Sequence, residues 1–87
     1  MIKKQEVLDH LLTLGLSKKE VDTNLRRLGI NSEQRIGCPI SQYLYDLGLK
    51  PLHSISFLYK AVWVGGFWFP LRLYPRLNGV ADFIVSC

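Results

Sequence analysis

The side chains in this sequence that could act as nucleophiles, bases or metal ligands are few and widely spaced. The chain has two cysteines, Cys38 and Cys87, and two histidines, His10 and His53. A nucleophilic thiol needs a lowered pKa and a nearby base, and Cys38 directly precedes Pro39 at the expected start of a helix. Neither histidine stands at a spacing that favours a pairing, and no close pair of ligands suggests zinc. We expect Cys38 to be a buried structural residue and no metal site to form.

Other catalytic patterns are also missing from the sequence. Its carboxylates lie mostly on the polar faces of expected helices, where solvent or neighbouring lysines account for them. The Gly65-Gly66 pair lacks the following Lys-Ser/Thr of a phosphate-binding loop. The sequence therefore predicts a protein that is not an enzyme and that needs no cofactor.

Length and composition predict one small globular domain over residues 1–87. Of the 87 residues, 48% are hydrophobic, which argues against disorder, and the net charge of +4 is compatible with an acidic partner or nucleic acid. The longest apolar run, residues 61–71, is interrupted by glycine and proline and falls short of the ~20 residues of a spanning helix. With no secretory signal recognised, we expect a cytoplasmic protein with free thiols and no membrane partner. A Cys38–Cys87 bridge stays open as the alternative.

The spacing of apolar residues predicts an α+β fold, with a helical part over residues 1–50 followed by a hairpin and a C-terminal helix over 51–87. Three helices are expected, over residues 3–14, 18–28 and from 39 to 47. Ser17 and Glu20 form a capping box before the second helix. Each helix is expected to end at a glycine followed by an apolar residue that packs back on the last turn, at Gly15, Gly29 and Gly48.

The second half of the sequence changes to a period of two. Alternation over residues 52–64 predicts a single strand with His53, Ile55, Tyr59 and Trp63 among the side chains on one face. A two-residue turn at Gly65-Gly66 leads into a short partner strand over residues 67–69, which makes a two-stranded antiparallel hairpin. A final helix is expected from about residue 75.

This hairpin carries more large aromatic side chains than four short helices can easily cover. Because tryptophan, tyrosine and arginine anchor many interfaces, we expect a surface that binds another protein or a second copy of the chain. A small regulatory or inhibitory protein is the leading hypothesis, and the alternative is that these rings simply form the core. The candidate residues are Tyr59, Trp63, Phe67, Trp68, Arg72 and Tyr74.

Residues 11–30 resemble the helix-turn-helix of DNA-binding proteins. The matching residues are Gly15-Leu16-Ser17, then Val21 and Leu25, then Leu28-Gly29-Ile30. This resemblance implies that the second helix lies in the major groove of DNA. An ordinary helical hairpin with a solvated polar face is the other interpretation. The residues that would face DNA are Lys18, Lys19, Asp22, Thr23, Asn24, Arg26 and Arg27.

A second resemblance covers most of the chain. Residues 25–30, the stretch from Cys38-Pro39-Ile40 to Tyr43-Leu44 and the proline-led C-terminal segment are similar to a group of small bacterial proteins. These proteins carry a Cys-Pro-Ile-x-x-Tyr-Leu box and have no characterised activity. The resemblance implies a compact α+β domain of bacterial or phage origin and implies no particular function.

Overall fold

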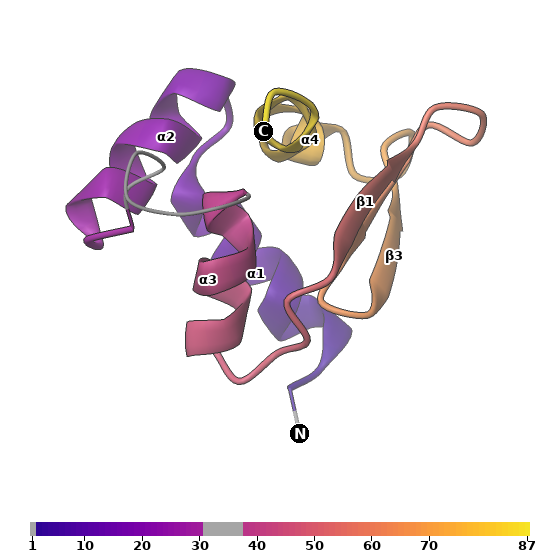
Figure 1. Cartoon of the computed structure of the whole chain (residues 1–87). Helices are drawn as coiled ribbons and strands as arrows, with labels where there is room; N and C mark the ends of the chain where they lie inside the picture. The colour runs from indigo at the N-terminus through magenta and orange to yellow at the C-terminus, as the bar shows by residue number, and fades with distance from the viewer. Residues whose placement is uncertain (1, 31–37) are drawn as a thin grey trace.

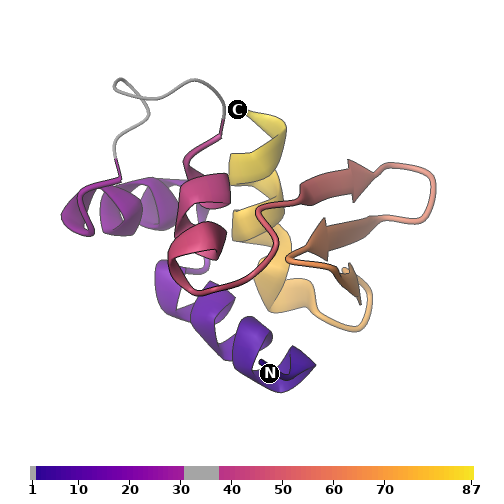
Figure 2. The ribbon, with the colours of Figure 1, turned by 60° about the horizontal axis from the view of Figure 1, so that its bottom comes forward.

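The computed structural model describes residues 2–30 and 38–87, and over these residues the chain forms four α-helices, a 3₁₀ turn and a three-stranded antiparallel sheet. Figures 1 and 2 show the helices gathered on one side of the sheet, which confirms the α+β class. In chain order the elements are α1 (Lys4–Leu14), α2 (Lys18–Arg27), α3 (Pro39–Asp46), β1 (His53–Ser56), β2 (Ala61–Val64), β3 (Phe67–Pro70), η2 (Pro75–Leu77) and α4 (Asn78–Val85).

The predicted start of α2 is confirmed in its main feature. The Ser17 hydroxyl oxygen accepts a hydrogen bond from the Glu20 backbone N–H at 3.2 Å. The Glu20 carboxylate in turn accepts a hydrogen bond from the Ser17 hydroxyl, also at 3.2 Å, instead of reaching the Ser17 backbone N–H. Ser17 is therefore the N-cap of α2. The arrangement differs from a capping box because the Glu20 carboxylate binds the Ser17 hydroxyl and not its backbone N–H.

Two of the three predicted helix ends have the expected form. At the end of α2, Gly29 has a φ of 80° and the Ile30 N–H donates to the Leu25 carbonyl at 2.9 Å. Gly48 has the same φ at the end of α3, and the N–H of the residue after it donates to the Leu44 carbonyl, also at 2.9 Å. This is the Schellman arrangement, in which a left-handed residue closes the last turn.

The end of α1 differs from the prediction. Gly15 adopts a φ of 136°, and the apolar residue after it, Leu16, is exposed, so no hydrophobic clasp forms. A Cβ added at Gly15 would lie 2.5 Å from the Glu20 Cβ. The glycine therefore serves a tight turn that brings the start of α2 directly against the end of α1.

The sheet has one more strand than the sequence predicted. Residues 57–60 form a turn that divides the expected strand into β1 and β2, with Lys60 in the left-handed region at a φ of 47°. The Ser56 hydroxyl oxygen accepts a hydrogen bond from the Tyr59 N–H at 3.2 Å and holds the turn. Because the chain reverses there, the predicted grouping of side chains is wrong, and Trp63 lies on the face opposite His53 and Ile55.

The predicted turn at Gly65-Gly66 is confirmed, and it joins β2 to β3 with Val64 opposite Phe67. On the helix-facing side of the sheet, Val62, Val64 and Phe69 are fully buried. They share one core with buried side chains from all four helices, among them Val7, Leu11, Leu25, Ile40, Leu44, Val80 and Ile84. The hydrophobic core thus lies between the sheet and the helices.

A disulfide bond joins Cys38 to Cys87, whose Cα atoms lie 5.1 Å apart. The expectation of free thiols is therefore wrong, because the residue before α3 and the residue beyond α4 meet in the folded chain. Within the part of the chain that the structure describes, no helix is long and apolar enough to cross a membrane.

Candidate functional site

The side of the sheet away from the helices carries an exposed aromatic cluster. Trp63 and Trp68 stand directly opposite each other on β2 and β3, with ring centroids 5.6 Å apart and the planes at 79°. Tyr59, from the turn between β1 and β2, meets Trp68 edge-on at 6.4 Å. We call these three side chains the aromatic face. Edge-to-face contacts of this kind favour this arrangement of the rings before any partner arrives.

The aromatic face is open to solvent among the described residues. Trp63 is 44% exposed and Trp68 is 36% exposed, so the interpretation of these two rings as simple core residues is wrong. The turn beside them, residues 57–60, adds Phe57 and Leu58, and Leu58 is 83% exposed. Figure 1 shows this turn at the outer tip of the sheet, away from the helices. A run of exposed apolar side chains this large is typical of a binding surface.

The remaining predicted binding residues lie elsewhere. Phe67 is half-buried and faces the helices, as does Val64, its partner on β2. Tyr74 is also half-buried, because its ring packs edge-on against Phe69 at 5.2 Å, and the Lys4 ammonium lies 5.3 Å from the Tyr74 centroid. Arg72 is exposed but lines a pocket between the turn and α4. The structure therefore unites three of the six predicted residues in one surface.

The basic side chains of α2 form the second candidate surface. Lys19, Thr23 and Arg27 are exposed, whereas Asn24 is half-buried and its side-chain amide donates to the Leu14 carbonyl at 2.6 Å. Arg26 pairs with Asp22 on the same helix at 3.0 Å. The Asn24 amide, which was predicted to contact a DNA base, thus stabilises the end of α1. The charge of Arg26 is partly neutralised by Asp22.

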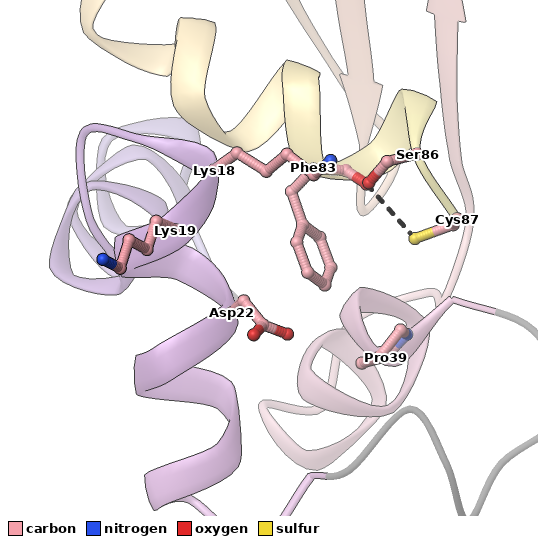
Figure 3. Close-up of a pocket in the computed structure, with 7 residues that line it drawn as sticks. All are labelled: Lys18, Lys19, Asp22, Pro39, Phe83, Ser86 and Cys87. Atoms are coloured by element: carbon pink, nitrogen blue, oxygen red, sulfur yellow. Dashed lines mark hydrogen bonds between the residues drawn. The ribbon is translucent and has the colours of Figure 1, made fainter.

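The opening between α2, α3 and α4 is a pocket of about 620 Å³, shown in Figure 3. Lys18 reaches across it toward Phe83 of α4, the Lys19 ammonium points away, and the Asp22 carboxylate points inward. Among the described residues that line it there is neither a histidine nor a free thiol, since Cys87 is bound to Cys38.

The two histidines differ in their contacts, because His53 is engaged through its ring and His10 through its backbone carbonyl. The His53 Nδ1 atom lies 3.0 Å from the Ser41 hydroxyl, and partial burial lowers the His53 pKa, opposed by a hydrogen bond to the Pro51 carbonyl. The carbonyl of His10 accepts a hydrogen bond from the Tyr43 hydroxyl at 3.1 Å, and burial raises the Tyr43 pKa. Among the described residues, no group of three or more His, Cys, Asp or Glu side chains could hold a metal ion.

Sequence reasoning missed Phe57 and Leu58 as surface residues. Both were placed inside a long strand, where alternation sends every second side chain to the core. The signal that could have located them is the run Phe57-Leu58-Tyr59, which breaks the polar-apolar alternation directly after a serine. Serine hydroxyls favour turns because they accept hydrogen bonds from the backbone two or three residues ahead.

Comparison with known proteins leaves the family open. No family model matches the chain, and no solved structure matches it. A segment of 39 residues is 41% identical to an F-box protein of Arabidopsis thaliana. That segment covers 45% of this chain and spans only 10% of the plant protein. The match is too short to assign a family or a partner, and the resemblance to small bacterial proteins stays a prediction.

Proposed function

We propose that this chain is a small, non-catalytic regulatory or inhibitory module that binds another protein through the aromatic face. The observation that carries the proposal is the open cluster of Tyr59, Trp63 and Trp68 on the sheet face that no described helix covers. Large aromatic side chains whose arrangement is already favoured by ring contacts lose less conformational entropy on binding, which makes them effective interface anchors.

Site-specific photo-crosslinking tests this proposal directly. A benzophenone amino acid would be placed at Tyr59, Trp63 or Trp68, and the chain would be irradiated in its own cells. Tyr45 of α3 offers a matched control, because it is 67% exposed and Tyr59 is 70% exposed. We expect one adduct of defined mass from the three positions of the aromatic face and none from Tyr45.

The recovered partner then allows a quantitative check. In a binding assay with that partner, Trp68→Ala is expected to weaken affinity by a factor of about 30, as removing a central aromatic anchor costs ~2 kcal/mol. Circular dichroism would verify that the variant is folded. Equal adducts from Tyr45, or an adduct of twice the mass of the chain, would contradict the proposal, the latter in favour of a homodimer.

Binding to duplex DNA through α2 is the second candidate function. The exposed cations Lys19 and Arg27 on one face of this helix favour it, while the engaged side chains of Asn24 and Asp22 argue against direct base recognition. Fluorescence anisotropy with labelled duplex DNA across a salt series would test it. DNA binding predicts an affinity that falls steeply with salt and is lost in Lys19→Glu with Arg27→Glu. No binding at low salt would eliminate this candidate.

A further inference from the structure

A second pocket of about 590 Å³ lies between the turn of residues 57–60 and α4. Part of its lining is apolar, and we call this part the floor: Ile55 of β1, Leu71 beyond β3 and two residues of α4, Ala81 and Val85. Its volume falls within the ~300–1,000 Å³ of small-ligand sites in proteins. The turn contributes to this pocket through Phe57 and to the aromatic face through Tyr59, so the two surfaces adjoin.

Among the described residues, three charged side chains line the pocket, and the two cations among them, which we call the rim cations, outnumber the carboxylate of Asp82. Lys60 and Arg72 both line it, and both are exposed. Within residues 2–30 and 38–87, the ion pair present is that between Arg26 and Asp22, so neither rim cation has a carboxylate partner there. The sequence contains no Asp or Glu between Asp46 and Asp82, although four cations lie in that interval. Residues 47–81, which include the whole sheet, therefore carry a net positive charge that attracts anionic groups.

We propose that this pocket is the anchor site for an acidic peptide segment of the protein partner. An apolar side chain of the segment would sit on Ile55, Leu71 and Val85, while neighbouring carboxylates would meet Lys60 and Arg72. Hydrogen bonds between such ions are among the stronger contacts at a protein surface. This inference rests on the proposed function and specifies the chemistry of the partner.

The shape and charge of the pocket favour a peptide over an anionic membrane. The site is concave, whereas a bilayer surface would meet the projecting turn and leave the pocket empty. Asp82 also lines the pocket, from α4, and its carboxylate would repel a dense layer of anionic headgroups. A peptide can instead place its acidic residues on the side of Lys60 and Arg72 and its apolar residue on the floor.

The test uses three synthetic probes with the intact, disulfide-bonded chain. The first is a capped peptide with a central phenylalanine between two glutamates on each side; the second replaces the glutamates by lysines, and the third replaces phenylalanine by alanine. Titrations would be followed by the amide NMR signals of Ile55, Leu71 and Val85. We expect the acidic phenylalanine peptide to bind at least about tenfold more tightly than either of the others.

Charge reversal identifies the residues that provide this selectivity. Lys60→Glu with Arg72→Glu is expected to weaken binding of the acidic peptide about tenfold and to favour the lysine peptide. Arg76→Glu is the matched control, because Arg76 is an exposed cation of η2 that does not line the pocket. Each change keeps the apolar floor intact, so a lost preference would reflect charge.

Equal affinity for the acidic and basic peptides, or signal changes confined to other residues, would overturn the inference. Sedimentation with phosphatidylserine–phosphatidylcholine vesicles, abolished by Leu58→Asp and without peptide selectivity, would assign the surface to lipid. Crosslinks at Trp63 and Trp68 that persist while peptide selectivity is absent would remove this inference and leave the proposed function standing. Peptide selectivity without those crosslinks would remove the proposed role of the aromatic face and leave the pocket as a peptide-binding site.

Discussion

At the level of single residues, the charge of His53 is linked to folding in the range just below neutral pH. Its ring lies in β1 beside the Ser41 hydroxyl and is partly withdrawn from water, so burial lowers the His53 pKa from its ordinary value near 6.5. A lowered pKa means that the unfolded chain binds the proton more readily than the folded chain. The stabilising contribution of neutral His53 is therefore complete above pH 6.5 and is lost as the pH falls below it.

This linkage predicts a specific pH profile. The free energy of unfolding, measured by urea denaturation, should fall between pH 7 and pH 5 more steeply for the native chain than for His53→Gln. Glutamine keeps a hydrogen-bonding side chain but carries no titrating proton. His10→Gln serves as the control for the other histidine. Parallel profiles for the native chain and His53→Gln would show that His53 does not contribute to the pH dependence.

At the level of elements, α4 crosses the turn between α1 and α2 at Gly79. A Cβ added at Gly79 would lie 2.5 Å from both the Leu16 carbonyl carbon and the Ser17 nitrogen. Those are backbone atoms, which cannot rotate away as a flexible side chain would. From the sequence alone, Gly79 only weakens the predicted helix. The need for glycine there becomes clear once α4 is seen to pack on the turn between α1 and α2.

Gly79→Ala should therefore destabilise the protein although alanine favours helices. In an open helix the change would stabilise by ~1 kcal/mol, but we expect overpacking against the turn to cost about 1–3 kcal/mol. The midpoint of thermal or urea unfolding would measure the effect. Asp82→Ala on the exposed side of α4 is the control, with an expected change within ~0.5 kcal/mol. A gain in stability for Gly79→Ala would contradict the close packing of α4 on this turn.

The elements that the sequence predicted best are those with local signals at both ends. The N-cap of α2 and the glycines that end α2 and α3 act within one helical turn, so nearby residues determine them. The turn at residues 57–60 contains no glycine, proline or asparagine, and its left-handed residue is Lys60. Without such a marker, periodicity alone extended one strand through the turn and placed Trp63 on the wrong face.

The candidate site was predictable to a similar extent. Residue type identified Tyr59, Trp63 and Trp68 as interface anchors, but the strand register decided which rings share a face. Phe67 alternates with Trp68 along β3 and so turns toward the helices, and Tyr74 is held against Phe69. The charge on α2 was also visible in the sequence, whereas the bond from Asn24 to the Leu14 carbonyl depends on how α1 and α2 pack.

At the level of the whole molecule, the Cys38–Cys87 bond ties the start of α3 to the end of α4 across a sequence separation of 49 residues. All three strands lie within the loop that it closes. A domain of 87 residues buries a modest fraction of its surface, so a covalent link of this span matters to its stability. Disulfides persist mainly in oxidising compartments, and the cytoplasmic location stays a prediction.

Removing this bond should lower the free energy of unfolding by about 4 kcal/mol, because the loop of about 50 residues then gains its full freedom in the unfolded chain. Urea denaturation with and without a reducing agent would measure the loss. Cys38→Ser with Cys87→Ser should match the reduced chain and should not respond to the reductant. Two thiols that react with a thiol reagent in the folded, unreduced protein would show that the bond is absent. Against a typical domain stability of ~5–15 kcal/mol, a loss of this size removes roughly a quarter to four fifths of the stability, so the reduced chain should stay folded but unfold at lower urea concentrations.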